Sequence, residues 1–455
     1  MRPDYTTARL SGWGRTTASS ARTARVATDE LAEHVKSATG RGVILRGLGR
    51  SYGDPAQNSG GTVLVLGGSV DEVVIDDATG VVTCPAGVSL HDLLRRVVPR
   101  GWFVPVTPGT RFVTVGGAVA SDIHGKNHHF EGSFGNHVHS LRLMLADGTV
   151  RTIGPDQEPR LFWATVGGMG LTGAILDVRF SLLPIETSVC RVETTRCRNL
   201  DELLAEMAHG DENHRYSVAW VDLLARGRRG GRSVLWRGDH ARLDEVDERR
   251  RLDPLSYAPR HLASVPPVVP SSGFVNSTTS ALFNELWFRK EPRRPARAMK
   301  SIPSYFHPLD AIGDWNRLYG RGGFVQYQFV VPLEREDALR EVVRRVVSSR
   351  LASPLIVLKR FGPGNPGPLS FPMEGWTLTV DMPAARDGLG PLLHALDAIV
   401  LEAGGRHYLA KDAHTTPEAI RRGYPHLDEW LAIRREVDPD RLWQSDLARR
   451  LELVA

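Results

Sequence analysis

The sequence predicts an α+β fold divided into two domains. Its 455 residues exceed the roughly 100–200 residues of a typical domain. Short apolar runs in the first part are joined by few and short amphipathic helices, which favours α+β over a regular alternation of strands and helices. After residues 182–184 the sequence becomes richer in Arg and in long amphipathic stretches, and glycine-rich sequence returns near Gly404. We therefore expect a first domain of residues 1–187 that residues 406–455 complete, with a second domain at 188–405 between them.

Apolar periodicity and capping residues place the elements in order. Asp29 or Thr28 can cap a helix that Gly40 ends, and a second helix begins after Ser89. The expected strands are at residues 43–45, 63–66, 73–75, 81–84, 216–221 and 323–331. A loop is expected at 265–273 and a last helix at 442–453. The Arg- and Ser-rich residues 1–25 lack the apolar core of a secretory signal; they could pass for a transit peptide, but a Gly-Trp-Gly turn favours ordered structure.

The composition excludes several classes of protein. Apolar residues make up 41% and charged residues 24%, which excludes disorder, collagen and coiled coil as the main architecture. The three cysteines, Cys84, Cys190 and Cys197, are too few for a disulfide framework and suit reduced, structural thiols, as in the cytoplasm. A net charge of +5 is weak evidence for nucleic acid and suits an anionic substrate or a membrane surface equally well. No stretch reaches the ~18 apolar residues of a membrane span, so we expect any membrane contact of the cytoplasmic or envelope-associated protein to be peripheral.

Two glycine-rich segments are candidate ligand-binding sites. Gly47, Gly49 and Gly53 can turn successive backbone N–H groups toward one point, a nest for phosphate oxygens, to which Arg50 adds charge. An ordinary glycine-rich turn explains them equally well. Small residues at 116–121 leave room for a large flat ligand, or for a tightly packed helix start. The histidine-rich continuation at 124–129 favours the ligand.

Two other motifs carry alternatives that the sequence disfavours. Residues 168–173 match the Gly-x-Gly-x-x-Gly dinucleotide fingerprint, but a strand-like segment follows where a helix is required, so we reject NAD binding. His124 and His128 have the i, i+4 spacing of metal ligands. Gly125 interrupts any helix there and no carboxylate or thiol joins them, so we expect a polar pocket lining and no metal.

Lys411 closes the last glycine-rich segment, residues 404–412. A lysine at the end of an apolar strand is usually exposed. In a pocket it would lose part of its hydration, and its lowered pKa would let it orient or deprotonate a hydroxyl group. Hydrolase, Walker and kinase motifs are missing from the sequence, so it offers no support for those activities.

In this order, these segments resemble the vanillyl-alcohol-oxidase type of flavoprotein, whose FAD domain, built from two small α+β subdomains, precedes a substrate domain with an antiparallel sheet. The likeness is greatest to the branch that oxidises the 2-hydroxyl of decaprenylphospho-β-D-ribofuranose to the 2-keto sugar, the first half of an epimerisation that supplies arabinose for cell-wall arabinan. The segments that carry this likeness are 46–54 with 57–58, 108–111, 122–129, 132–137, 161–168, 323–329, 361–363, 410–412 and 446–453.

The resemblance implies roles for named residues. FAD would be bound by Leu45, Arg46, Gly47, Leu48, Gly49, Arg50, Ser51, Tyr52, Gly53, Asp54, Pro55, Gly109, Thr114, Val115, Gly116, Gly117, Ser121, Asp122, Ile123, His124, Ile175 and Tyr408. The substrate pocket would comprise Tyr52, His124, Lys126, Trp220, Gln326, Gln328, Lys359, Thr377, Thr379 and Lys411. Lys411, His124 and Tyr52 are the expected catalytic residues. Covalent relatives carry a histidine at the position of Arg50, so the attachment of FAD here should be non-covalent.

Two positions depart from the family's pattern. Thr379 stands where the family has the cysteine that nitroaromatic inhibitors trap, and Thr377 replaces a neighbouring asparagine. The expected partners are a quinone-like electron acceptor and an NADH-dependent short-chain reductase. Two rival functions remain: a soluble alditol or aldonolactone oxidase that uses oxygen, and a sugar- or lipid-binding protein that has lost its flavin.

Overall fold

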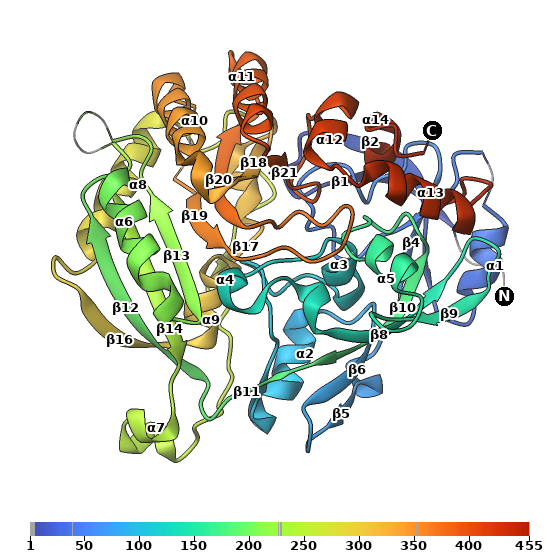
Figure 1. Ribbon diagram of the computed structural model, residues 1–455, viewed down its shortest axis with the longest axis horizontal. Helices are drawn as coiled ribbons and strands as arrows, with labels where there is room; N and C mark the ends of the chain where they lie inside the picture. The colour runs from blue at the N-terminus through green and yellow to red at the C-terminus, as the bar shows by residue number, and fades with distance from the viewer. Residues whose placement is uncertain (1–4, 39, 226, 228–229, 352–353, 455) are drawn as a thin grey trace.

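Two small sheets form the N-terminal unit (Figure 1). The computed structural model describes residues 5–38, 40–225, 227, 230–351 and 354–454. The first sheet has the order β1-β2-β4-β3, and the second, entirely antiparallel, has the order β5-β6-β10-β8-β9. Their bounds are β1 Thr6–Ser11, β2 Ala18–Val26, β3 Val43–Leu45, β4 Thr62–Leu66, β5 Val74–Asp76, β6 Val81–Pro85, β8 Val138–Met144, β9 Val150–Ile153 and β10 Ala174–Ser181. The strand β10 directly follows the Gly-x-Gly-x-x-Gly segment, as the sequence predicts.

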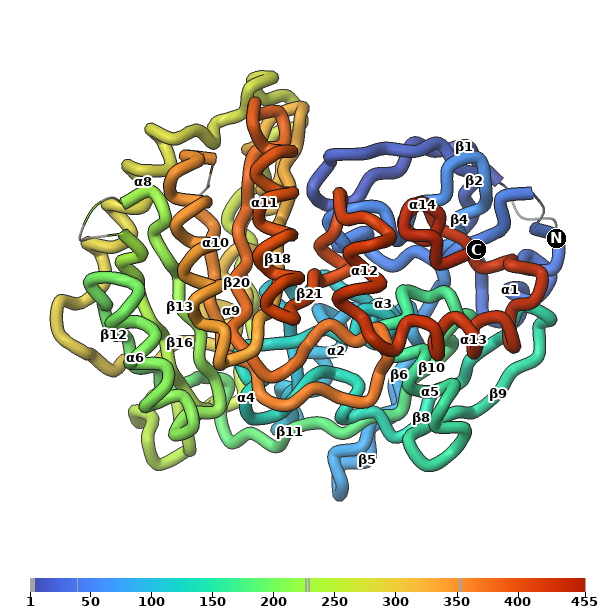
Figure 2. Tube along the Cα trace, turned by 45° about the horizontal axis from the view of Figure 1, so that its top comes forward, coloured from blue at the N-terminus to red at the C-terminus, as the bar shows by residue number. Residues whose placement is uncertain are grey.

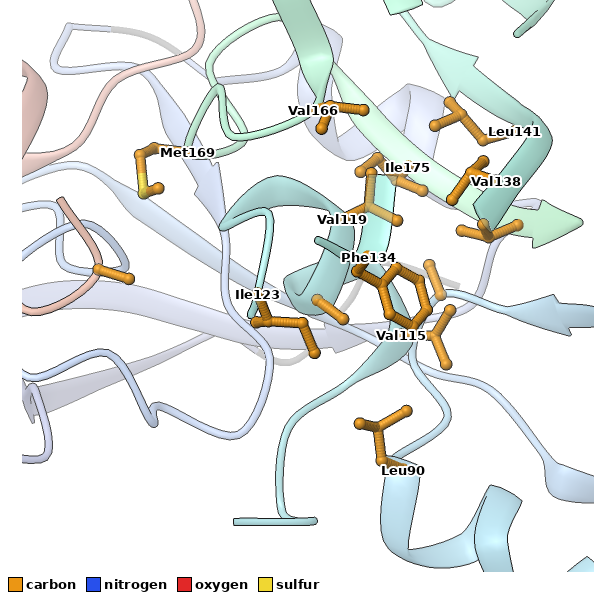
Figure 3. Packing of buried hydrophobic residues seen from close by; sticks show 14 of the residues in the cluster. Leu90, Val115, Val119, Ile123, Phe134, Val138, Leu141, Val166, Met169 and Ile175 are labelled. Atoms are coloured by element: carbon orange, nitrogen blue, oxygen red, sulfur yellow. The ribbon is translucent and has the colours of Figure 1, made fainter. Parts of the chain in front are cut away.

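Short helices pack on these sheets. They are α1 Leu31–Lys36, α2 Leu90–Val97, α3 Val115–Ala120, α4 His128–Glu131 and α5 Pro159–Thr165. Ser89 caps α2 by accepting the N–H of Asp92, which confirms the predicted helix start. Figure 3 shows α3 at the centre of this core, where Val115 and Val119 lie among residues of α2, β8 and β10. The buried contacts fix the loops on both sides of α3.

An eight-stranded antiparallel sheet forms the second unit, in the order β16-β12-β14-β13-β19-β20-β18-β21. Its strands are β12 Val189–Cys197, β13 Tyr216–Val221, β14 Ser233–His240, β16 Ala296–Ser301, β18 Phe324–Val331, β19 Ile356–Phe361, β20 Gly375–Pro383 and β21 Arg406–His407. Three helices, α6 Leu200–Gly210, α10 Glu336–Ser349 and α11 Leu389–Glu402, share a second hydrophobic core with this sheet. Figure 1 shows these helices on the sheet. The predicted strands at 216–221 and 323–331 are confirmed.

Smaller elements complete this unit and its link to the first. They are β7 Trp102–Phe103, which pairs with β11 Leu183–Pro184, β15 Ala263–Ser264, which pairs with β17 Ile312–Gly313, and the helices α7 Glu248–Arg251, α8 Ser277–Lys290 and α9 Ile302–Phe306. The segment 265–273 is the loop that the sequence predicts. No helix in the described ranges has the length and apolar character needed to cross a membrane.

The C-terminal chain returns to the N-terminal unit (Figure 2). It contains α12 Pro417–Gly423, α13 Leu427–Val437 and α14 Asp446–Arg450. Trp430 and Trp443 are fully buried in the N-terminal core. The predicted helix at 442–453 is wrong in its start and end. Val43 in β3 exchanges backbone hydrogen bonds with Leu442 and Gln444, so this stretch is extended, and Ser445 caps the short helix α14.

This return is consistent with the expected domain division, and we propose 1–187, 188–405 and 406–455 as the domain limits. The sequence did not predict β1 and β2, although the turn at residues 12–14 indicated ordered structure. Gly12 and Gly14 lie against the backbone of residues 52–53 and 324, and the N–H groups of Trp13 and Gly14 donate to Ser51 and Tyr52. The β1–β2 hairpin therefore holds the predicted ligand loop in place.

Candidate active site

A cavity of about 570 Å³ is lined by residues of both units. One wall comes from the N-terminal unit and includes Leu45, Arg46, Gly47, Leu48, Gly49, Arg50, Ser51, Tyr52, Pro55, Gly109, Thr114, Gly116, Gly117, Ser121, Ile123, His124 and Ile175. The eight-stranded sheet and the C-terminal chain contribute Gln326, Gln328, Lys359, Thr379, Tyr408 and Lys411. The structure thus brings together most of the residues that the sequence analysis singles out.

The glycine-rich loop presents unused donors to this cavity. Within the described part of the chain, the backbone N–H groups of residues 47–51 donate to no protein atom. Gly49 has a φ of 65°, which favours glycine. Gly53, which was predicted to belong to the nest, is required by close packing instead: an added Cβ would lie 1.8 Å from the backbone oxygen of Asp412. Five successive free donors are the arrangement that an anionic ligand needs.

The structure supports both explanations of the small residues in the second glycine-rich segment: close packing of a helix start and room for a ligand. A Cβ on Gly116 would lie 2.8 Å from that of Ala86, so tight packing of α3 explains this glycine. Gly109 faces open space and lines the cavity, where an added side chain would take up room. Val115, Gly53, Asp54 and Asp122 do not line the cavity. The Asp122 carboxylate instead accepts hydrogen bonds from Ser133, Ser370, Asn365 and the N–H of Gly135.

Strand alternation explains why the opposite wall is polar. In β18, β19 and β20, every second residue packs against the helices, and the residues between them face the other way. Register places Gln326 opposite Asp381, and Gln328 opposite Thr379. Lys359 is the partner of Thr377 on the other side of β20. One face of an otherwise apolar sheet therefore gathers amides, hydroxyls, a carboxylate and a lysine.

Lys411 lines the cavity beside the ring of Tyr52 and near the buried carboxylate of Asp381. Its Nζ is 3.8 Å from the centre of the Tyr52 ring. Burial lowers the pKa of Lys411, and nearby Asp381 opposes this shift. Burial likewise raises the pKa of Asp381, although Gln326 donates to its carboxylate at 2.5 Å. The amine and the carboxylate are thus close to exchanging a proton near neutral pH, which is the property of a group that moves protons.

His124 is held as a neutral ring. Its Nε2 lies 2.9 Å from Nε2 of Gln328, whose amide group donates, so the ring nitrogen accepts and its proton is on Nδ1. Burial and the charges of Lys359 and other neighbours keep the pKa of His124 well below its usual value. Nδ1 has no partner within the described chain. The same Gln328 amide donates to Thr377, which in turn donates to the carbonyl of Phe329.

Three expected substrate residues do not line the cavity. Trp220 is buried and donates its indole N–H to the carbonyl of Pro354 at 2.7 Å. Lys126 donates to the carbonyl of Tyr305, with its Nζ 4.2 Å from the centre of that ring. Thr377 is fully buried behind Gln328. By contrast, Lys359 lines the cavity, where burial lowers its pKa to about 7.

The neighbouring histidines have separate partners. His128 packs 4.4 Å from the Phe361 ring, and His129 lies within hydrogen-bond distance of the carbonyls of Asp211 and His214. His137 contacts Glu131, and His139 contacts Ser181. Among the described residues, no group of three or more His, Cys, Asp or Glu side chains is arranged to hold a metal ion.

The chain is similar along its whole length to an enzyme of known name. It is 45% identical over 99% of its length, and 98% of the relative, to a decaprenylphosphoryl-β-D-ribose oxidase of Mycolicibacterium smegmatis. A model of the FAD binding domain matches residues 25–154. The chain belongs to the decaprenylphosphoryl-β-D-ribose oxidase family. It is therefore an FAD-dependent oxidoreductase, with the α+β architecture of the vanillyl-alcohol-oxidase type.

More distant relatives share parts of this pattern. An L-gulono-1,4-lactone dehydrogenase of Mycobacterium tuberculosis is 23% identical over 93% of both chains. Cytokinin dehydrogenase 4 of Arabidopsis thaliana is 30% identical over 32% of this chain and 28% of its own. A model of D-arabinono-1,4-lactone oxidase matches residues 381–451, a range that begins at Asp381 and contains Lys411.

The cavity fits the FAD of this oxidase family. The free N–H groups of residues 47–51 suit the pyrophosphate, and Gly109 leaves room along the wall. Arg50 adds a positive charge, with its guanidinium carbon 4.0 Å from the centre of the Trp13 ring. Burial lowers the pKa of Arg50, and the nearby Asp310 and Asp314 oppose this shift. A guanidinium group is a poor nucleophile, so Arg50 can bind an anion without forming a bond to the flavin ring.

We expect acid or heat denaturation to release all of the FAD into solution, because Arg50 stands where a covalent tether would need a histidine. The measurement is flavin absorbance in the supernatant and in the precipitated protein. Flavin that remains with the washed precipitate would contradict non-covalent binding.

The sequence analysis missed Asp381, Asp310 and Trp315. Asp381 is the only charged residue in β20, and its position alternates with apolar ones, which is a signal that the sequence contains. Asp310 accepts the N–H of Arg111 and lies 3.5 Å from its guanidinium group, while Trp315 lines the cavity near Trp13. These two lie in the 185–320 region, where short irregular elements give little periodicity to read.

Proposed function

We propose that this protein oxidises the 2-hydroxyl of decaprenylphospho-β-D-ribofuranose, or of a similar polyprenyl-phosphosugar, to the 2-keto sugar. The observation that carries the proposal is the wall opposite the glycine-rich loop, where two lysines, Lys359 and Lys411, line the cavity together with the amides of Gln326 and Gln328. One lysine can meet a phosphate and the other a hydroxyl group. The name of the relative at 45% identity supports the same substrate.

The reaction removes two hydrogens from one carbon and its oxygen. FAD, when bound, supplies the acceptor for the hydride from carbon. The hydroxyl proton needs a base, and Lys411 is suited to it because burial lowers its pKa toward neutrality. Asp381 lies close enough to affect that pKa and can take the proton onward. His124 and Gln328 provide a fixed hydrogen-bonding surface, since the buried ring stays neutral.

We expect substrate binding to weaken as the pH rises above about 7. Burial lowers the pKa of Lys359 to about 7, so its amine is charged below that pH and neutral above it. A phosphodiester stays anionic over this range, so its attraction to Lys359 is lost on the alkaline side, at most tenfold in affinity per pH unit. The measurement is the dissociation constant of a phosphoribosyl diester, followed by flavin absorbance from pH 6 to 9.

Lys359→Met is the matched variant for this titration. It should bind weakly at every pH and lose most of the pH dependence. Affinity that is flat or rises with pH in the unchanged protein would show that Lys359 does not contact the phosphate.

The substrate class is tested by anaerobic flavin reduction with a panel of phosphosugars, each with and without a prenyl tail. We expect bleaching with polyprenyl-phosphoryl ribose and little with free sugars. The match of residues 381–451 to an aldonolactone oxidase model favours a second candidate, a soluble sugar-lactone oxidase that uses oxygen. Rapid bleaching by aldonolactones or alditols, with fast reoxidation by oxygen, would establish that candidate instead.

The partners follow from the same chemistry. We propose that a quinone-like acceptor takes the electrons and that a separate NADH-dependent reductase reduces the 2-keto sugar. A polyprenyl tail keeps its substrate in a bilayer, so we propose that the protein works in peripheral contact with a membrane.

We expect Thr379→Cys to form a covalent adduct with nitroaromatic compounds that are reduced in the site, whereas the unchanged protein should not. Thr379 lines the cavity, and a threonine hydroxyl is a far weaker nucleophile than a thiolate. The native cysteines are buried outside the cavity, and burial raises the pKa of Cys84 to about 12. Intact-protein mass spectrometry after turnover measures the adduct. An adduct on the unchanged protein would show that another side chain reacts.

A further inference from the structure

The helix α8 (Ser277–Lys290) has its polar and apolar sides reversed. Its two buried residues are polar, Ser280 and Asn284, and Asn284 donates to the carboxylate of Asp222 at 2.6 Å. Its outward side carries Leu282, Phe283 and Leu286, of which the two leucines are 62% and 61% exposed. A helix of a soluble domain normally buries its apolar side. This one is anchored so that its apolar side faces outward.

The chain before α8 also exposes large apolar side chains. The 24 residues from His261 to Asn284 contain no Lys, Arg, Asp or Glu. Leu262, Val268 and Phe274 are all more than half exposed. Together with Leu282, Phe283 and Leu286 they form what we call the apolar segment. Several large apolar side chains exposed within one short segment are typical of a binding surface.

Cationic residues follow the apolar segment directly. Residues 285–300 contain six cationic and two anionic side chains. Arg289, Lys290, Arg293 and Arg294 are exposed, and Lys290 lies over the ring of Trp287. Exposed apolar side chains beside such cations are complementary to the surface of an anionic bilayer, where chains enter the acyl region and cations meet the headgroups.

The apolar segment begins at the edge of the active-site cavity. Leu262 donates its N–H to the carbonyl of Ala311, and β15 pairs with β17 at Ile312–Gly313. His261 and Ile312 line the cavity, so Leu262 adjoins its rim. Figures 1 and 2 show α8 on the outer side of the eight-stranded unit, away from the C-terminal helices. The N-terminal end of the apolar segment is therefore tied to a strand that lines the cavity.

We propose that the apolar segment and the cations of residues 289–294 dock the protein on an anionic phospholipid bilayer. The surface is defined by residues outside the catalytic wall, so its existence is independent of the reaction. Its use, delivery of a polyprenyl-linked sugar from the bilayer to the cavity, rests on the proposed function.

The test is flotation of the purified holoenzyme with vesicles of phosphatidylcholine, alone or mixed with phosphatidylglycerol. The unchanged protein should float with the mixed vesicles, and higher salt should weaken this binding. The variant Leu282→Ser, Phe283→Ser, Leu286→Ser should bind about tenfold more weakly, because it loses three side chains that would enter the bilayer. The matched control is Val74→Ser with Val150→Ser, two residues of the N-terminal unit that are 67% and 50% exposed, and this variant should bind normally.

Failure of the docking proposal is distinguishable from failure of the proposed function. No flotation of the unchanged protein, or equal flotation of the α8 variant, would overturn docking through this surface. Both proteins should also be tested with a water-soluble phosphoribose that carries a short tail. Equal flavin reduction in the two is expected and shows that the α8 variant is folded, whereas no reduction in either contradicts the reaction and leaves the flotation result to decide the docking.

Discussion

Replacing Lys411 with alanine is expected to slow substrate-driven flavin reduction by about 10²–10⁴-fold while FAD stays bound. The size follows from the loss of a positioned base, since Lys411 lines the cavity and its amine has a lowered pKa. Anaerobic stopped-flow absorbance gives the rate, and the flavin spectrum of the untreated variant reports cofactor retention. Reduction at a near-normal rate would show that Lys411 takes no part in the chemistry.

Asp381→Asn supplies a signature that simple damage to the cavity would not give. Asp381 raises the pKa of Lys411, so removing its charge should lower that pKa further. The amine is then neutral at lower pH, and the acid limb of the rate profile should move to lower pH. An acid limb at the same pH in Asp381→Asn would show that Asp381 does not affect the pKa of the catalytic base.

Replacing Arg450 with methionine is expected to destabilise the protein and to release FAD. Arg450 joins the glycine-rich loop to the C-terminal chain: it forms two hydrogen bonds to Asp54 at 2.7 and 3.0 Å and lies 2.8 Å from Asp412. Removing one partner of a buried ion pair costs about 3–5 kcal/mol, because the remaining charges lose their compensation. Here two carboxylates would be left, one of them in the loop that carries the free N–H groups. The thermal midpoint and the fraction of retained FAD measure the effect.

Arg421→Met is the control for this change. Arg421 is half exposed, and its contacts with Asp428 and Glu452 are 3.8 Å or longer, so it should contribute about 0–1 kcal/mol. Equal stability and equal FAD content in the two variants would contradict the role given to Arg450.

Local patterns predicted those parts of the fold that local interactions determine. Ser89 and the stripe that follows it identified α2, and the apolar run at 216–221 identified β13. The prediction of a helix at 442–453 was wrong at its start because it used a local pattern only. The first residues of this segment pair with Val43, some 400 positions away in the chain. The return of the C-terminal chain is a long-range contact that periodicity alone cannot reveal.

The candidate site shows the same limit. Gln326, Gln328 and Thr379 were expected in the pocket and line it, because alternation in β18 and β20 turns them to one face. Trp220 lies on the same face of the sheet, but its indole N–H donates to the carbonyl of Pro354, and the side chain does not line the cavity. Asp381 could have been predicted from that alternation, since it has the parity of Thr377 and Thr379 in an apolar strand. The packing of the neighbouring unit decides which positions along a strand line the cavity, and this long-range packing cannot be predicted from the pattern of one strand.

The most direct test of the proposed reaction is anaerobic single turnover with polyprenyl-phosphoryl ribose that carries deuterium at carbon 2. If the 2-hydroxyl is oxidised, flavin bleaching should slow relative to the unlabelled substrate, and mass spectrometry should find a keto sugar without the label. As a control, substrate that carries deuterium only at carbon 3 should bleach the flavin at the same rate as unlabelled substrate. Bleaching that is insensitive to deuterium at carbon 2, with the label retained in the oxidised product, would contradict oxidation at this position.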